Sequence, residues 1–249
     1  MWETTVDGRV LHFRLAGINN QNFIMRDDET GTWWQQVTGK ALHGPLAGRQ
    51  LKQVVHDELS FAIWKREQPQ GRVLKPEEQI AAQNKYEAAD WEMRVGRMRV
   101  VDGTDVDQRL APRTLVIGLD IGGRAKAYPL AALQKQSPIV DIVGSVPVVL
   151  LLGEDRRSVR AFERTVDGRR LEFFQKTDQP GEPAPHDGQT GGKLLLLDAE
   201  TGSTWNFEGK AIAGPLAGRQ LKKLFVLEDY WFDWRIYHPD TSVYDIGPR

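Results

Sequence analysis

Carboxylates and histidines beside turns are the residues of this chain best suited to acid–base or metal-assisted chemistry. Asp141 precedes a glycine turn, Glu200 lies within an Asp-x-Glu-Thr-Gly turn, and His238 precedes a proline. Groups of these types exchange protons near neutral pH when a pocket shifts their pKa values. These three residues are therefore candidate catalytic groups, and the competing interpretation is that they are ordinary turn and core residues.

Aromatic and basic residues provide candidates for binding a ligand. Tyr128 stands before Pro129, His43 sits beside a glycine and proline turn, and Trp34 and Trp205 occupy equivalent positions of a repeat. The chain has 8 tryptophans, whose rings could stack on a flat ligand or a sugar. Burial of these rings between sheets explains the same pattern and is the favoured interpretation.

Possible metal ligands are present but are not arranged as in known sites. The turns at 27–31 and 198–202 carry the carboxylate pairs Asp27/Glu29 and Asp198/Glu200, which could bind Ca²⁺, yet an Asx-type hairpin turn accounts for the same residues. The acidic cluster at 102–107 has no glycine at the sixth position of the loop and no terminal glutamate, both of which an EF-hand needs. The 5 histidines show no metal-binding spacing. The sequence predicts no metal site and identifies no cofactor.

Composition excludes several classes of protein. No cysteine is present, which excludes disulfides, thiolate nucleophiles and cysteine-ligated metals. There is no Gly-x-Ser-x-Gly elbow, Walker loop or dinucleotide fingerprint. The 33 basic and 34 acidic residues nearly cancel, so no nucleic-acid partner is predicted. No apolar run approaches the ~18 residues of a membrane helix, and no charged and apolar leader opens the chain. We therefore expect a soluble chain or a mature one.

An internal repeat organises the chain. Residues 2–74 recur as residues 162–244, and the segment from Gly44 to Lys52 recurs letter for letter from Gly214 to Lys222. The second copy carries an extra loop at 179–192 that is rich in glycine and proline, and such an insertion belongs on the surface. We expect a pseudo-symmetric pair that mimics a dimer within one chain.

Each copy is predicted to be β structure. Asp7-Gly8 and Asp167-Gly168 each separate two short strand-like runs, which is typical of tight hairpin turns. Short helical segments near 61–65 and 230–235 are expected to close the two copies. The sequence therefore predicts a mainly β fold of the α+β class, with antiparallel hairpin-rich sheets, short helices and an internal pseudo-repeat.

Three regions follow from this pattern. Residues 1–75 form an N-terminal half-unit that repeats the C-terminal part, residues 76–110 form a helical linker, and residues 111–249 form a complete domain. Within the linker, proline and acidic residues favour a helix from Pro76 to Trp91, through which the half-unit is expected to pack on the domain. The middle of the chain is predicted to contain a helix opened by Pro129 and strands at 115–119, 124–128, 139–142 and 146–152.

A series of short matches runs in order through residues 111–245. It includes Val116-Ile117-Gly118, Arg124 to Leu130, Pro147-Val148-Val149, Glu200-Thr201-Gly202-Ser203 and His238-Pro239-Asp240-Thr241. This region resembles the bacterial domain-of-unknown-function family numbered 3179. Residues 2–74 resemble half of the same domain. The resemblance implies a β-rich fold and, because many relatives look exported, an extracytoplasmic location.

Typical members of that family follow the Pro-Val-Val strand with a Cys-Pro-x-Cys-like pair. Counting along this chain places Gly153 and Arg156 at those two positions. The resemblance therefore implies a variant that lacks the family's redox or metal pair. Arg156, which stands at the second position of this missing pair, is a candidate ligand-binding residue together with Tyr128.

Three functions remain open on this evidence. The leading hypothesis is a non-redox ligand-binding or accessory module that kept the family's scaffold. The second is the acid–base or metal-assisted enzyme described above. The third is a protein-interaction scaffold in which segments 44–52 and 214–222 present equivalent surfaces. A small molecule or a protein partner is therefore expected.

Overall fold

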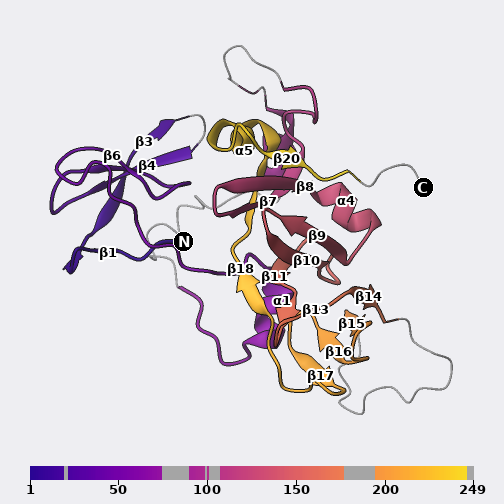
Figure 1. Ribbon diagram of the computed structural model, residues 1–249. Coiled ribbons are helices and arrows are strands. Elements are labelled where there is room, and N and C mark those ends of the chain that lie inside the picture. The colour runs from indigo at the N-terminus through magenta and orange to yellow at the C-terminus, as the bar shows by residue number, and fades with distance from the viewer. Residues whose placement is uncertain (20–21, 75–89, 99, 101–106, 177–193, 246–249) are drawn as a thin grey trace.

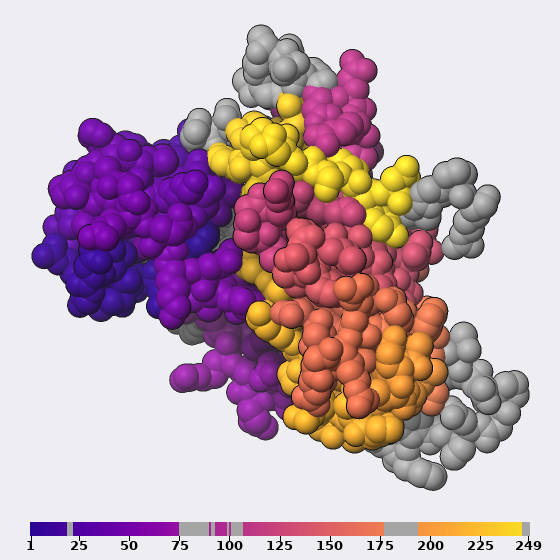
Figure 2. Space-filling view, in the orientation of Figure 1, coloured from indigo at the N-terminus to yellow at the C-terminus, as the bar shows by residue number. Residues whose placement is uncertain are grey.

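A computed structural model describes residues 1–19, 22–74, 90–98, 100, 107–176 and 194–245. Within these residues the fold is mainly β, with several antiparallel sheets and short helices, as the sequence predicts. Two β-rich lobes flank a central body (Figures 1 and 2). None of the described helices is long and apolar enough to cross a bilayer.

The central body is built from the middle of the chain and three C-terminal strands. Its elements are β7 (Leu115–Ile121), β8 (Arg124–Pro129), α4 (Leu130–Lys135), β9 (Ile139–Val143), β10 (Val146–Leu152), β11 (Val159–Glu163), β18 (Lys222–Leu224), β19 (Leu227–Tyr230) and β20 (Ser242–Val243). The strands form two four-stranded sheets, ordered β19-β7-β8-β20 and β18-β11-β10-β9. Apolar side chains of both sheets and of α4 meet in one core cluster. The predicted strands and the helix after Pro129 are confirmed.

Strand β10 is buried on both faces, which explains its unbroken apolar sequence. Val148 and Leu150 point into the core cluster between the two central sheets. Val149 and Leu151 point the other way, into a second cluster shared with the C-terminal repeat. The strand therefore joins the central body to that repeat through a continuous core.

The two copies of the repeat fold alike. The first contains β1 (Thr5–Val6), β2 (Arg9–Val10), β3 (Phe13–Asn19), β4 (Asn22–Asp27), β5 (Trp33–Gln35) and β6 (Ala41–His43). The second contains β12 (Thr165–Val166), β13 (Arg169–Arg170), β14 (Phe173–Gln175), β15 (Leu195–Asp198), β16 (Thr204–Asn206) and β17 (Ala211–Ala213). Each copy is a two-stranded hairpin followed by a four-stranded antiparallel sheet. We call residues 2–53 the first unit and residues 162–223 the second unit.

Polar contacts are duplicated along with the strands. An ion pair joins Arg49 to Asp7 at 2.9 Å, and its counterpart joins Arg219 to Asp167 at 2.8 Å. Both aspartates lie at positive φ in their hairpin turns, as the Asp-Gly pairs predict. The repeat is therefore preserved in three dimensions, down to single surface contacts.

The helices that follow the two units cross over to the opposite unit. Helix α1 (Phe61–Glu67), after the first unit, inserts Ile63 into the core cluster of the second unit. Helix α5 (Trp231–Tyr237), after the second unit, places Asp233 against Asn22 of the first unit. Ile63 and Asp233 occupy the same position of the repeat. This exchange joins the two halves of the chain (Figure 1).

The described contacts between the halves include those of α1, of α5 and of the segment before α1. Residues 76–89 of the predicted linker helix lie outside the described residues, and the described helix α3 (Trp91–Arg97) begins where that prediction ends. The predicted surface loop at 179–192 and the acidic residues Asp102 and Asp105 also lie outside them. Asp107, the third member of that acidic cluster, forms an ion pair with Arg109 at 2.5 Å.

Gly118 of β7 provides a test of how tightly α5 packs on the central body. A Cβ atom added there would lie 2.1 Å from the Trp234 ring, which is fully buried. We expect Gly118→Ala to lower the free energy of unfolding by about 1–3 kcal/mol, because overpacking forces the ring to move. The matched control is Gly17→Ala in β3, where a Cβ atom meets nothing within 4 Å. Equal urea midpoints for both variants would contradict this packing.

Candidate functional site

A large cavity among the described residues lies where α1 crosses onto the second unit. It has a volume of about 960 Å³. We call it the Arg160 groove, defined by six of its lining residues: Asp57, Phe61, Trp64, Glu67, Arg160 and Lys223. These residues come from the segment before α1, from α1 itself, and from the neighbouring strands β11 and β18. The groove thus exists only because the two halves of the chain meet.

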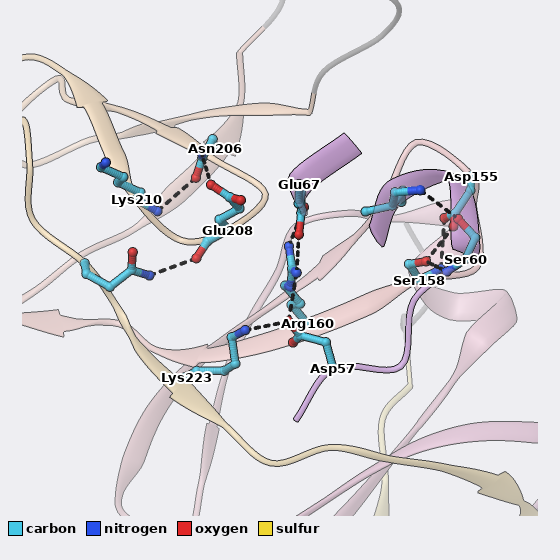
Figure 3. A network of polar contacts seen from close by, with 12 residues as sticks. Asp57, Ser60, Glu67, Asp155, Ser158, Arg160, Asn206, Glu208, Lys210 and Lys223 are labelled. Atoms are coloured by element: carbon cyan, nitrogen blue, oxygen red, sulfur yellow. Dashed lines mark hydrogen bonds and ion pairs between the residues drawn. The ribbon is translucent and has the colours of Figure 1, made fainter. Parts of the chain in front are cut away.

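A network of four charged side chains forms the polar part of the groove (Figure 3). Arg160 is 3% exposed and donates through Nη1 and Nη2 to the two carboxylate oxygens of Glu67, at 2.9 and 2.7 Å. Its Nη2 also donates to Asp57 Oδ2 at 2.8 Å. Lys223 Nζ donates to the same Asp57 oxygen at 2.6 Å. The two positive charges of Arg160 and Lys223 therefore balance the two negative charges of Asp57 and Glu67.

The protonation states of this network follow from its contacts. Burial raises the pKa of Asp57, but the hydrogen bonds from Arg160 and Lys223 outweigh it, so the pKa lies below the usual carboxyl value. Burial lowers the pKa of Arg160, and the hydrogen bonds that it donates to Glu67 and Asp57 outweigh this and raise it. Both residues are consequently ionised at neutral pH.

Two aromatic rings supply the apolar part of the groove. Phe61 and Trp64 lie one turn apart on α1, and their rings stack with centroids 5.6 Å apart at 25°. Phe61 is 61% exposed. A large apolar ring that remains in water on a short helix is a candidate contact for a ligand.

Helix α1 is fixed in this place by its N-terminus and by its buried face. The backbone N–H of Ser60 donates to Ser158 Oγ at 2.9 Å, and Ser158 Oγ donates to Asp155 at 2.5 Å (Figure 3). Ile63 is fully buried, and a Cβ atom added at Gly153 would lie 3.0 Å from its Cδ1 atom. The helix therefore packs directly on the turn at 153–158.

The structure brings together two of the residues that the sequence selects, Tyr128 and Asp141. The Tyr128 hydroxyl donates to Asp141 Oδ2 at 2.8 Å, and Lys126 Nζ lies 2.6 Å from the same oxygen. Tyr128 is fully buried and stacks on Tyr244 with centroids 5.3 Å apart. Burial, together with the Asp141 charge, raises the pKa of Tyr128, so its hydroxyl stays protonated and donates.

His238 lies in a neighbouring part of the central body. Its ring stacks on Trp234 at 3.7 Å, and Nε2 is 3.6 Å from Asp120. Burial lowers the pKa of His238, so the imidazole is neutral at pH 7. His238 and Lys126 line one cavity of about 460 Å³. Glu200 does not line it and instead accepts the backbone N–H of Glu172 at 2.8 Å.

Trp34 and Trp205 are core residues, so the idea that they present stacking faces to a ligand is wrong. Both rings are fully buried, as the favoured interpretation predicts. Each indole N–H donates at 2.8 Å to a fully buried carboxylate, Asp27 in the first unit and Asp198 in the second. The same carboxylates accept from the hydroxyl and backbone N–H of the threonine three residues later. The carboxylate oxygens of Asp27 and Asp198 therefore accept hydrogen bonds within their own turns. No group of three or more His, Cys, Asp or Glu side chains that could bind a metal occurs within the described residues.

The remaining candidates lie on the surface. His43 is exposed on β6. Arg156 is exposed in the turn at positive φ and donates to the Gln134 carbonyl oxygen at 2.9 Å. Neither residue lines the Arg160 groove.

The residues that form the groove were missed in the sequence. One signal could have identified Arg160, which interrupts the apolar strand Val159-Arg160-Ala161-Phe162. A charged residue at a buried strand position must find a partner of opposite charge. The sequence does not show that this partner is Glu67 in the other half of the chain.

Comparison with known proteins gives one match. A family model described as "Protein of unknown function (DUF3179)" matches residues 1–241. No curated protein and no solved structure matched the chain. The family match includes the first unit, so it extends well beyond the region at 111–245 on which the resemblance rests. Because it covers nearly the whole sequence, the chain belongs to the DUF3179 family.

Proposed function

We propose that this protein is a non-redox, ligand-binding member of its family and that the Arg160 groove holds the ligand. The observation that carries the proposal is the combination, in one cavity, of a fixed polar network and a stacked aromatic pair of which Phe61 is exposed. Ligand pockets in proteins typically join apolar walls to a few oriented polar groups.

The chemistry of the groove indicates a neutral, hydroxyl-bearing ring such as a sugar unit. Asp57 and Glu67 already neutralise Arg160 and Lys223, so the network offers no excess charge to an ion. Carboxylate oxygens and ammonium groups can still accept from and donate to hydroxyl groups. The rings of Phe61 and Trp64 can cover the apolar face of such a ring.

The packing of α1 supports a non-redox role. The chain has no cysteine, and Gly153 stands at the first position of the pair that the family resemblance implies. Even a Cβ atom there would meet Ile63 Cδ1 at 3.0 Å. The crossed-over helix thus fills space that a reactive side chain would need.

A titration of the full chain with a panel of neutral monosaccharides and oligosaccharides tests the proposal. We expect tryptophan fluorescence and calorimetry to detect binding, and we expect Trp64→Ala to weaken it about tenfold, because one stacked ring contributes roughly 1–1.5 kcal/mol. Trp33→Ala is the matched control, since Trp33 is 38% exposed on the first unit and does not line the groove. Absence of binding across the panel, or equal losses in both variants, would show that the groove is not the site.

An acid–base enzyme is the second candidate, and the Tyr128–Asp141–Lys126 contacts favour it. They place a buried hydroxyl and an ammonium group within hydrogen-bonding distance of the same carboxylate. Incubation with any sugar that binds, followed by mass spectrometry of the products, distinguishes the two functions. Turnover that is lost in Asp141→Asn favours the enzyme, and unchanged ligand after long incubation favours binding alone.

A further inference from the structure

The contact between the first unit and α5 depends on a buried carboxylate. Asp233 of α5 is 5% exposed, and its Oδ2 atom accepts a hydrogen bond from Asn22 Nδ2 of β4. Its Oδ1 atom has no hydrogen-bond partner within the described part of the chain. An ionised carboxylate that is buried with one unsatisfied oxygen is costly, whereas a protonated one is tolerated.

A second carboxylate lies close to the first. Asp229 of β19 interacts electrostatically with Asp233 and with Glu58, and both interactions are repulsive. Its Oδ1 atom accepts the backbone N–H of Tyr230 at 2.7 Å. Neither Asp229 nor Asp233 forms an ion pair among the contacts described for residues 1–19, 22–74, 107–176 and 194–245.

No cation is among the described partners of this pair. The guanidinium of Arg113 lies over the Tyr230 and Phe232 rings, 5.2 Å from each centroid, and α5 itself carries Arg235. Helix α5 contributes the hydroxyl of Tyr237, and β4 contributes the amide of Asn22. Strand β7 places Val116 opposite Asp229. The segment before α1 contributes Glu58, which itself lies 3.4 Å from His56. The described partners of the pair are therefore neutral or negative.

Burial, and then the charge of Asp233, raise the pKa of Asp229 to about 8. Burial also raises the pKa of Asp233 to about 6, although the hydrogen bond from Asn22 opposes it. Both groups are neutral in mildly acidic solution and become charged as the pH rises through this range.

We propose that Asp229, Asp233 and Asn22 form a proton-dependent latch that docks the first unit on α5 and releases it as the solution becomes alkaline. The docked state binds protons that the released state loses, so docking is strongest in acid. It weakens as the pH rises from the ordinary carboxyl pKa of 3.8 to the raised values of about 6 for Asp233 and about 8 for Asp229. Ile63 stays anchored in the core of the second unit, so the first unit moves while α1 remains in place.

Release would open a cavity between the two halves. This cavity has a volume of about 420 Å³ and is lined on one side by Trp2, Lys40 and Gln50, and on the other by Trp234 and His238. In the docked state the first unit covers these central-body residues. Proton release would therefore expose a surface that carries His238.

Small-angle scattering of the full chain at constant ionic strength tests the latch. We expect the radius of gyration to increase between about pH 5 and about pH 8.5, with unchanged far-UV circular dichroism. The double variant Asp229→Asn/Asp233→Asn should stay compact at both pH values, because amides carry no titrating charge. The matched control, Asp28→Asn, removes an acidic side chain that is 55% exposed on the same unit and should expand as the wild type does.

Two results would overturn the proposal. One is a wild-type radius that does not change with pH, and the other is a double variant that expands as much as the wild type. If the double variant fails to fold, Asn22→Ala provides an independent test. This change removes the donor from the first unit, so it should shift the midpoint of expansion to lower pH, and an unshifted midpoint would contradict the latch.

Discussion

Replacing Arg160 with methionine is expected to lower the free energy of unfolding by about 3–5 kcal/mol. The change keeps an apolar side chain of similar length but removes the partner of two carboxylates. Asp57 would keep only Lys223, and Glu67 would lose both of its short hydrogen bonds. Breaking a buried ion pair from one side is costly because the remaining charges stay buried. Urea denaturation followed by circular dichroism measures the loss.

The matched control for this prediction is Arg219→Met. Arg219 forms an ion pair with Asp167 at 2.8 Å, but its side chain is 58% exposed. An exposed pair contributes only about 0–1 kcal/mol. Adding Glu67→Gln to the Arg160 variant should recover part of the loss, because it removes one unpaired charge. A loss below about 1 kcal/mol for Arg160→Met would show that the network does not hold α1 on the second unit.

Replacing Asp198 with alanine is expected to cost about 3–5 kcal/mol, because several buried donors lose one acceptor. The indole N–H of Trp205 and the hydroxyl of Thr201 both donate to Asp198, at 2.8 Å in each case. The backbone N–H of Thr201 donates at 2.6 Å. A buried donor without a partner costs about 1–3 kcal/mol, and these costs act together in one turn.

The first unit supplies a matched comparison. Asp27→Ala removes the same contacts to Trp34 and Thr30, so the local cost should be similar. Thermal unfolding of the two variants then shows whether the units melt together. The control Asp28→Ala removes a neighbouring exposed carboxylate and should change the midpoint little. If Asp27→Ala and Asp198→Ala both behaved like this control, the carboxylates would not be structural.

The strands of this fold could be predicted because their signals are local. Strand β10 has an unbroken apolar sequence, and Asp7-Gly8 and Asp167-Gly168 specify hairpin turns at positive φ. The burial of Trp34 and Trp205 was harder to predict, since a tryptophan suits both a core and a binding surface. The deciding fact is the carboxylate seven residues earlier, which accepts each indole N–H only after the turn has formed.

The groove could not be predicted from local patterns. Arg160 meets Glu67 and Asp57 across 93 and 103 residues of sequence, and Lys223 meets Asp57 across 166. Such contacts follow from where α1 packs, and the buried Ile63 side chain is one of the contacts that decide this. Ile63 suits an apolar core, whereas the equivalent Asp233 does not, so the two helices cannot exchange places without burying a charge.

The identical segments Gly44–Lys52 and Gly214–Lys222 also bear on how the chain avoids misassembly. During folding, either segment could pair with the strands of the wrong copy, because both offer the same residues and the same Asp–Arg contact. The correct pairing must therefore be selected by residues that differ between the two copies. Ile63 and Asp233 differ in this way, because one is apolar and the other acidic. A swapped chain would bring Asp233 to the apolar site and leave Ile63 against Asn22, so the residues at this one position disfavour the swapped arrangement.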